Sequence, residues 1–513
     1  MAAGAWWRDA VVYEIYVRSF ADSDGDGVGD LAGIRSRLGY VADLGVDAIW
    51  LTPFYPSPMH DAGYDVTDYC DVDPRFGTLA DFDLLLAEAH ALGLRVYVDV
   101  VPNHTSVEHP WFQAAIADRS SPMRDWYIFR PPAADGSPPN DWKSVFGGSA
   151  WTRAPDGDYY LHLFDSSQPD LNWRNPAVHE QFHAILRFWL AREVDGFRID
   201  VAHALYKDRD LHPGDRNAWD QDEVFGVWRE WRKVIDDYDG RAFVGEVFLY
   251  DMDRVAQYVG RTRLHQAFNF VVARTPFDAT VLRATIRRSL ELFLRSGTSP
   301  TWVLSNHDLV RHPTRYGGGE RGVRRGRAVT ALLLALPGSP YLYQGEELGL
   351  EQSDVPPDRR QDPTWFRQGG IGRDGCRTPM TWTVAAPGHG FTTGDPWLPF
   401  DEQARARNVE LEEADPGSTL HFYRRALALR RELAPSLRRS VGWPDAHADC
   451  VVVTRPTRDG RTLTAVLNTA RASRQLQLDA GAGAVVLCSA GRARFDPGTG
   501  TLTVPAEAAV WVV

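Results

Sequence analysis

The sequence predicts an α/β protein built on a closed (β/α)8 TIM barrel, with a small inserted domain and a C-terminal antiparallel β-sandwich. The chain has 513 residues, more than a single hydrophobic core usually supports. From residue 11 to residue 434, short β-rich runs alternate with segments of helical periodicity, as in a parallel sheet with crossover helices. We count eight such strands, and this number favours a closed barrel over an open sheet.

The first part of the barrel, residues 1–103, is expected to contain three strands. These strands and the helices between them are predicted, in order, at residues 11–17, 31–44, 46–51, 79–92 and 94–101. The second helical pattern ends at Gly93, a residue type that commonly follows a helix.

The alternation stops between His104 and Asn175. This stretch is rich in proline, glycine, aspartate and tryptophan, and only short segments such as 158–164 resemble strands. A structureless connection of that length is improbable in a compact protein. We therefore predict that residues 104–175 form a small inserted domain after the third strand.

The alternation resumes in residues 176–434, the second part of the barrel. A helical pattern at residues 176–193 precedes the strand that ends at Asp200, and another at residues 219–238 precedes the strand that ends at Glu246. The remaining strands and helices are predicted, in order, at residues 264–270, 281–293, 302–305, 323–336, 340–343 and 420–433. From residue 435 the pattern changes to period-two alternation with glycine and aspartate turns, so residues 435–513 are predicted to form the β-sandwich.

Composition restricts the classes of function. The formal net charge of −12 argues against a surface that binds nucleic acid or an anionic membrane. No apolar run reaches the roughly 18 residues that a membrane span needs, and residues 1–10 lack the features of a signal peptide. The four cysteines are scattered, without the spacing of metal ligands. We therefore expect a cytoplasmic protein with no nucleic-acid or membrane partner, and nothing in the sequence indicates its oligomeric state.

Several predicted strands end in acids or histidines. Polar residues at the carboxyl ends of barrel strands line one shared pocket, and these ends carry His104, Asp200, Glu246, His307 and Asp308. Three acids without a dense histidine or cysteine cluster favour acid–base and covalent chemistry over transition-metal chemistry. We expect no organic cofactor.

Arg198 and Asp200 share one face of their strand because side chains alternate along it. The permanent cation favours the ionised form of Asp200, which a nucleophile needs; an ordinary ion pair at a strand end is the alternative interpretation. Glu246 follows an apolar approach, which predicts a raised pKa and a protonated acid. Neighbouring strands lie about 4.8 Å apart, close to the roughly 5–5.5 Å between the two carboxyl groups of a retaining glycosidase.

The residues after the first strand resemble the first half of a calcium-binding loop. Acids alternate with other residues, and the candidate ligands are Asp22, Asp24, Asp26, the Val28 carbonyl and Asp30. Gly33 stands where an EF-hand would have glutamate, so the loop is not an EF-hand. We predict a structural Ca²⁺ site, and a solvated acidic turn is the alternative interpretation.

The motifs together closely resemble the α-amylase family, glycoside hydrolase family 13, in its oligo-1,6-glucosidase and α-glucosidase branch. The resemblance covers essentially the whole chain. It is carried by DVVPNH at 99–104, QPDLN at 168–172, GFRID at 196–200, VGEV at 244–247 and SNHD at 305–308.

The resemblance implies Asp200 as nucleophile, Glu246 as general acid–base and Asp308 as a stabiliser that holds sugar hydroxyls. It also implies a set of residues that bind the substrate, namely Asp61, Tyr64, His104, Phe164, Arg198, His307 and Arg311. A surface ion pair is the alternative interpretation of Arg311, and core packing is the alternative for Phe164. The acidic loop is similar to the calcium loop of the same branch.

The implied function is that of a retaining, exo-acting α-glucosidase. Such an enzyme releases terminal α-1,4-linked glucose from maltose, short oligosaccharides or α-glucosides, and can also transfer it to other hydroxyl groups. Val201 accompanies α-1,6 cleavage in some relatives, but Ala202 and His203 differ from the Ile-Asn of those relatives. The alternatives are an oligo-1,6-glucosidase, a transglucosidase and a trehalose synthase-like isomerase. Related barrels that are subunits of amino-acid transporters lack some of the acids, so that class is not expected.

Overall fold

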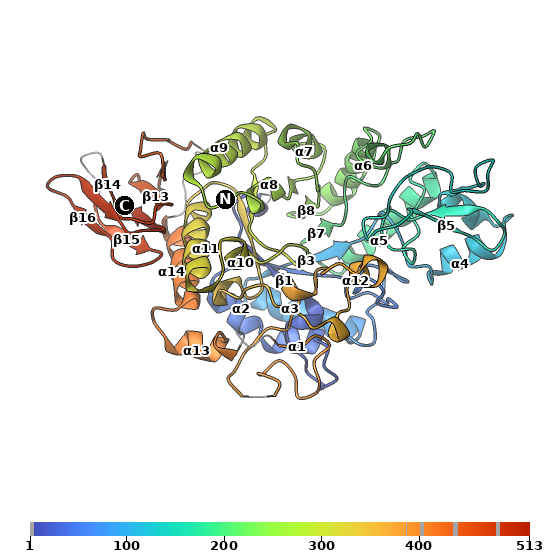
Figure 1. The fold of residues 1–513 in the computed structure, drawn as a ribbon, viewed down its shortest axis with the longest axis horizontal. Helices are drawn as coiled ribbons and strands as arrows, with labels where there is room; N and C mark the ends of the chain where they lie inside the picture. Colours follow the sequence, from blue (N-terminus) through green and yellow to red (C-terminus); the bar gives the residue numbers. More distant parts are fainter. Residues whose placement is uncertain (1–4, 386, 401–404, 434–439, 479–482) are drawn as a thin grey trace.

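The computed structural model describes residues 5–385, 387–400, 405–433, 440–478 and 483–513. Its centre is an eight-stranded parallel sheet with the strand order β10-β11-β1-β2-β3-β7-β8-β9 (Figure 1). In chain order these strands are β1 (Val12–Ile15), β2 (Ala48–Leu51), β3 (Arg95–Val100), β7 (Gly196–Ile199), β8 (Ala242–Gly245), β9 (Gln266–Ala267), β10 (Thr301–Val303) and β11 (Ser339–Tyr343). The nearly closed parallel sheet confirms the predicted barrel.

A side chain connects the two end strands of the sheet. The Thr301 hydroxyl of β10 donates a hydrogen bond to the Ala267 carbonyl of β9 at 2.8 Å, and it accepts one from the Asn269 amide at 3.2 Å. Strand β9 has only two residues, so it offers few backbone groups for pairing. The Thr301 hydroxyl therefore helps to close the barrel where β9 meets β10.

Helices follow most of the strands and pack around the sheet (Figure 1). Those near their predicted positions are α3 (Leu79–Ala91), α5 (Pro176–Ala191), α6 (Val224–Asp236), α9 (Ala279–Arg295), α11 (Gly319–Leu334) and α14 (Thr419–Leu433). The helix expected at 31–44 is divided at Arg37 into α1 (Leu31–Ser36) and α2 (Leu38–Leu44). Among the described residues, no helix combines the length and apolar character that crossing a bilayer requires.

A small separate unit lies between β3 and α5, at the right of Figure 1. It contains helix α4 and an antiparallel sheet of order β4-β6-β5, with the bounds α4 (Pro110–Ala117), β4 (Phe129–Arg130), β5 (Trp151–Arg153) and β6 (Tyr159–Leu161). Asp170 of this unit forms a buried ion pair with Lys207 of the loop after β7, with Nζ 2.7 Å from Oδ2. The ion pair holds the unit against the strand ends.

The C-terminal residues form two antiparallel sheets of order β12-β13-β18-β15 and β14-β17-β16, at the left of Figure 1. Their strands are β12 (Cys450–Pro456), β13 (Thr462–Asn468), β14 (Arg474–Gln477), β15 (Val485–Cys488), β16 (Arg494–Asp496), β17 (Thr501–Val504) and β18 (Ala508–Val512). Buried Glu507 joins these sheets to α11 through ion pairs with Arg321, Arg324 and Arg325. The predicted boundary between residues 434 and 435 lies outside the described residues.

Candidate active site

A cavity of about 1110 Å³ lies at the carboxyl ends of the barrel strands. Most of the site residues that the sequence indicates line it, namely Asp61, Tyr64, His104, Phe164, Asp200, Glu246, His307 and Asp308. They come from the loops that follow β2, β3, β7, β8 and β10 and from the inserted unit. The barrel therefore brings residues that are far apart in the sequence to one cavity.

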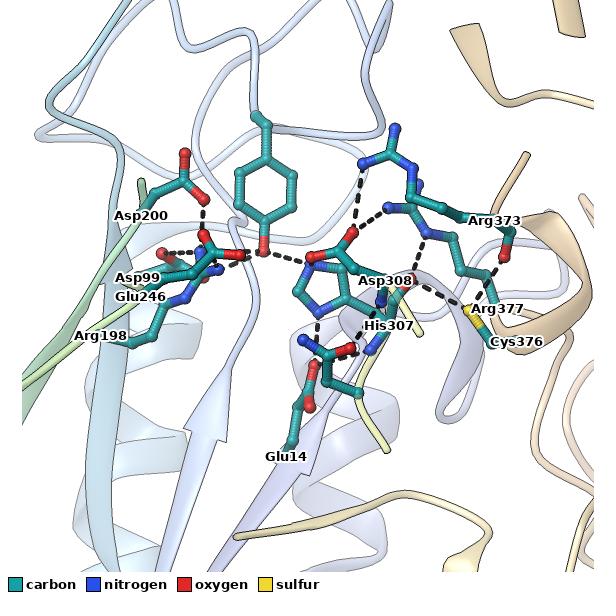
Figure 2. Close-up of polar contacts among 12 residues, drawn as sticks. Glu14, Asp99, Arg198, Asp200, Glu246, His307, Asp308, Arg373, Cys376 and Arg377 are labelled. Atoms are coloured by element: carbon teal, nitrogen blue, oxygen red, sulfur yellow. Dashed lines mark hydrogen bonds and ion pairs between the residues drawn. The ribbon is translucent and has the colours of Figure 1, made fainter. Parts of the chain in front are cut away.

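Arg198 is the cation on which the buried acids converge. It lies on β7 opposite Asp99 of β3 in the sheet register, and both side chains are fully buried. Its Nη1 is 3.0 Å from Asp99 Oδ1 and 2.6 Å from Asp200 Oδ1, and its Nη2 is 2.6 Å from Glu246 Oε2. One guanidinium group thus holds Asp200 and Glu246 at the cavity by its two arms (Figure 2).

The electrostatic surroundings of the acids differ from those expected. Glu246 does not lie in an apolar setting, because it contacts Arg198 and also accepts a hydrogen bond from the Val201 amide at 3.1 Å. Burial raises the pKa of Asp200 well above its ordinary value, and Arg198 only opposes this rise. Burial likewise raises the pKa of Asp99 to about 7. Asp99 and Asp200 both contact the Arg198 guanidinium, so the ionisation of Asp200 is coupled to that of Asp99.

The backbone around the two carboxyl groups is tightly constrained. Val201 has a φ of 40°, a left-handed conformation that is unfavourable for a β-branched residue. This conformation turns the chain directly after Asp200 and directs the Val201 amide at Glu246. A Cβ at Gly245 would lie 2.4 Å from Leu264 Cδ1, so any larger residue just before Glu246 would require the buried Leu264 side chain to move.

Asp308 has the opposite environment to Asp200. Arg373 Nη1 and Arg377 Nη2 lie 3.2 Å and 3.0 Å from Asp308 Oδ1, and His307 Nε2 lies 3.2 Å from Oδ2. Burial alone would raise the pKa of Asp308, but His307 and the two guanidinium groups hold it well below its ordinary value. Asp308 is therefore a permanent anion at neutral pH.

Sequence reasoning missed Arg373 and Arg377. Both come from the long segment between β11 and helix α13 (Val409–Ala414), which carries little regular structure. Arg373 Nη2 also lies 2.6 Å from Asp61 Oδ1, so this segment closes one side of the cavity. Two arginines four positions apart are a weak signal, and only the fold places them against Asp308.

Aromatic and imidazole side chains complete the inner wall. The rings of Tyr64 and His307 are stacked, with centroids 5.4 Å apart and planes at 16°. Burial lowers the pKa of His104 to about 4, so this ring is neutral at pH 7. The Phe164 ring lies 5.1 Å from that of His104 and lines the cavity, which places it at the site and not only in the core.

Arg311, which the sequence predicts to contact substrate, is not among the residues that line the cavity. The side chain is buried, and its guanidinium donates to the Gln344 carbonyl at 2.8 Å and to the Cys376 carbonyl at 3.1 Å. It also lies over the Tyr343 ring, 4.5 Å from the centroid. Arg311 therefore fastens the loop after β10 to the segment after β11.

The loops after β7 and β8 form the mouth of the cavity, which the sequence did not reveal. They contribute a group of aromatic and apolar side chains, with one histidine: His203, Trp219, Phe248, Leu249 and Tyr250. Trp219 stacks on His203 at 5.5 Å, and Tyr250 is 69% exposed. Helix α6 begins at Val224 and not at residue 219, and this later start leaves Trp219 in the loop.

Part of the acidic loop has the geometry of a cation site. Carboxylate oxygens of Asp22, Asp24 and Asp30 lie within 4.8 Å of one another. Asp26 is not part of this group, and its Oδ1 accepts a hydrogen bond from the Val28 amide at 2.7 Å. Oxygen ligands in this arrangement suit Ca²⁺.

The fold and the site define a class of protein. A (β/α)8 barrel that presents Asp200, Glu246 and Asp308 around one cavity has the architecture of a carbohydrate-cleaving barrel. Residues 14–439 match the family described as "Alpha amylase, catalytic domain". The chain therefore belongs to the α-amylase family, glycoside hydrolase family 13.

Individual relatives refine this placement. The chain is 44% identical over 457 residues to a "Probable alpha-glucosidase" of Rhizobium meliloti (strain 1021), covering 83% of this chain and 82% of the relative. It is 36% identical over 477 residues to an "Oligo-1,6-glucosidase" of Parageobacillus thermoglucosidasius, covering 83% and 84%. Among solved structures, the "alpha-glucosyl transfer enzyme, XgtA" superimposes with a TM-score of 0.91 at 40% identity, covering 99% of each chain.

The central position of Arg198 can be tested by unfolding. Arg198→Met leaves buried acids without their shared cation, so urea titration should show the free energy of unfolding lowered by about 3–5 kcal/mol. Arg216→Met is the matched control, because Arg216 is an exposed arginine at the cavity mouth, and it should change the free energy by less than about 0.5 kcal/mol. Equal stability of the two variants would show that Arg198 does not hold the site together.

Proposed function

We propose that the protein is a retaining, exo-acting α-glucosidase that removes terminal glucose from maltose, short oligosaccharides or α-glucosides. The observation that carries this proposal is the attachment of Asp200 and Glu246 to the two arms of one buried guanidinium group at the cavity. Two carboxyl groups so placed fit the division between a nucleophile and an acid–base in retaining glycosidases.

In the first step, Asp200 attacks the anomeric carbon of the terminal glucose while Glu246 donates a proton to the glycosidic oxygen. The bond to the leaving alcohol breaks and a glucosyl ester forms on Asp200. In the second step, Glu246 removes a proton from water, the resulting oxygen attacks the same carbon, and Asp200 is released. Two inversions return the α configuration.

Arg198 serves both steps. When Asp200 becomes an ester it loses its negative charge, and the guanidinium then interacts more strongly with Glu246. An adjacent cation favours the ionised form of a carboxyl group. The change at Asp200 thus prepares Glu246 to act as the base that the second step needs.

Contacts that join three segments around Asp61 support attack at a chain end. Asp61 Oδ1 forms an ion pair with Arg373 Nη2 at 2.6 Å, and Asp61 Oδ2 accepts a hydrogen bond from the Gln168 side-chain amide at 3.1 Å. These contacts join the loop after β2 to the inserted unit and to the segment after β11. A cavity blocked in this way accepts one terminal sugar, held through its hydroxyls by Asp61, His104, His307 and Asp308.

Transfer of glucose to another hydroxyl group is the second candidate. The mouth carries Trp219, Phe248 and Tyr250, and aromatic faces bind sugar rings and other organic acceptors better than they bind water. A transfer enzyme is also among the similar solved structures. The same glucosyl ester is the intermediate of both hydrolysis and transfer. For either reaction, we propose that the bond cleaved in the substrate is an α-1,4 linkage.

Incubation with maltose and separation of the products tests the function. Glucose as the sole product supports hydrolysis, whereas trehalose or new disaccharides support the transfer or isomerase alternatives. Comparison with isomaltose, sucrose, trehalose and soluble starch then defines the linkage and chain length. Failure to cleave any α-glucoside would contradict the proposal.

The roles of the two acids predict distinct variants. Asp200→Gly and Glu246→Gly should each lower turnover by about 10³-fold or more. With an activated aryl α-glucoside, added azide should restore turnover of Asp200→Gly and give β-glucosyl azide as the product, because azide attacks from the face that Asp200 leaves open. Azide should also restore turnover of Glu246→Gly, but with α-glucosyl azide as the product, because azide then attacks the glucosyl ester on Asp200. Asp251→Asn, at an exposed acid of the mouth that caps α7 (Met252–Tyr258), should stay within about threefold, because asparagine also caps helices.

We also propose that the acidic loop binds a structural Ca²⁺ through Asp22, Asp24 and Asp30. The Asp22 amide donates to the Phe391 carbonyl at 2.9 Å, so a bound ion would stabilise the contact between this loop and the segment after β11. Binding only to the folded state stabilises it, by about 2.7 kcal/mol at a hundred times the dissociation constant.

Thermal melting in Ca²⁺ and in EDTA tests the metal site. The unfolding midpoint should be higher in Ca²⁺, and Asp24→Asn should remove most of the difference. Asp26→Asn is the control, since Asp26 lies outside the cluster, and it should keep the response. Identical midpoints of the unaltered protein in Ca²⁺ and EDTA would contradict the proposal.

A further inference from the structure

A buried glutamate that no sequence motif indicated, Glu14, contacts the site residue His307. Glu14 lies on β1, is 2% exposed, and pairs in register with Trp50 of β2 and Tyr343 of β11. Its Oε1 is 2.5 Å from His307 Nδ1. Figure 2 shows Glu14 on the far side of the His307 ring from Asp308. Glu14 does not line the cavity, so any influence on the substrate passes through His307.

The hydrogen-bond partners of His307 determine where its protons lie. Its Nε2 is 3.2 Å from Asp308 Oδ2 and 2.8 Å from the Tyr64 hydroxyl. The Tyr64 hydroxyl donates its hydrogen to Asp99 Oδ2 at 3.1 Å, and an ionised carboxylate such as Asp308 only accepts hydrogen bonds. Nε2 therefore faces two acceptors and must carry a hydrogen. If the ring is neutral, Nδ1 then has no hydrogen, and the hydrogen between Nδ1 and Glu14 must come from the Glu14 carboxyl group.

A second arrangement carries the same number of protons. A doubly protonated His307 beside an ionised Glu14 differs only in the position of one proton along a 2.5 Å contact. The third arrangement, an ionised Glu14 with a neutral ring protonated at Nδ1, has one proton fewer. It places the Nε2 lone pair against Asp308, and two acceptors facing each other in a buried site are unfavourable.

Electrostatics favour keeping the proton. Burial raises the pKa of Glu14 well above its ordinary value, and Asp308 and Asp99 add to the rise; Arg198 and the His307 backbone amide, which donates to Glu14 Oε1 at 3.4 Å, oppose it. Burial lowers the pKa of His307, although Asp308 opposes that change. The groups that face the pair from the surrounding elements are Tyr16, Tyr64, Asp99, Arg198, Asp308, Tyr343, Arg373 and Arg377.

We infer that Glu14 is a positioning residue that keeps one proton on the Glu14–His307 pair at neutral pH, so that the Nε2–H of His307 is a donor directed into the cavity. With a substrate present, this donor binds a glucose hydroxyl between His307 and Asp308. The inference rests on the proposed α-glucosidase function. It assigns Glu14 the task of setting the protonation of a residue that touches the sugar.

The pH dependence follows from the sign of the effect. In the proposed arrangement the pair holds its proton at neutral pH and loses it as the pH rises through the raised pKa of Glu14. Loss leaves Nε2 without its hydrogen and removes a contact to the sugar. The value of kcat/KM, which reports groups of the free enzyme, should therefore fall on the alkaline side.

The experiment uses α-glucosyl fluoride, whose leaving group needs no proton from Glu246, so that Glu246 does not produce the alkaline fall. For the unaltered enzyme, kcat/KM should decline at alkaline pH. Glu14→Gln should remove that decline, because the glutamine amide donates a hydrogen bond to Nδ1 and cannot titrate. At pH 7 its kcat/KM should stay within about threefold of that of the unaltered enzyme. Glu14→Leu should lose tenfold or more at all pH values, and thermal melting should confirm that both variants are folded.

Glu347→Gln is the matched control. Glu347 is a buried glutamate that contacts the hydroxyls of Tyr13 and Tyr40 at 2.7 Å and 2.8 Å, and its replacement should leave the alkaline decline in place. The inference is overturned if Glu14→Gln changes the acid side of the profile, or neither side. No cleavage of α-glucosyl fluoride by the unaltered enzyme would instead count against the proposed function itself.

Discussion

One buried cation governs the arrangement of the site. Arg198 is fully buried and binds Asp99, Asp200 and Glu246, and a buried guanidinium without these partners would be strongly destabilising. The register of β3 and β7 places Asp99 opposite Arg198, and the end of β8 supplies Glu246. The sheet pairing therefore fixes the relative positions of Asp200 and Glu246, the proposed nucleophile and acid–base, before any substrate binds.

The two sides of the cavity differ in charge balance, and this difference separates the roles of the acids. On the side of Asp200 three acids share one guanidinium, so burial raises the pKa values of Asp200 and Asp99. On the side of Asp308 two guanidinium groups and His307 hold the pKa of one acid low. In the proposed mechanism, Asp308 thus offers a fixed charge for holding sugar hydroxyls, while the group around Arg198 redistributes charge during the reaction.

Sequence reasoning recovered the parts of the structure that depend on local pattern. The barrel follows from the alternation of strands and helices, and Asp200, Glu246 and Asp308 follow from their places at strand ends. It missed Glu14, Arg373 and Arg377, because their importance comes from contacts with residues distant in the chain. It also placed Arg311 at the substrate, although its guanidinium binds backbone carbonyls of Gln344 and Cys376. The local sequence pattern predicts which residues lie at the end of a strand. Which distant side chains contact those residues depends on how the elements pack in the folded protein.

The most direct measurement is the identity of the residue that carries the covalent sugar. The enzyme can be treated with 5-fluoro-α-glucosyl fluoride, which slows both steps and lets the glucosyl ester accumulate, and the labelled peptide can be sequenced by mass spectrometry. The expected result is a single label on Asp200, within the segment that contains Arg198. A label on Glu246 or on another residue, or rapid turnover without any ester, would contradict the claim that Arg198 holds Asp200 as the nucleophile.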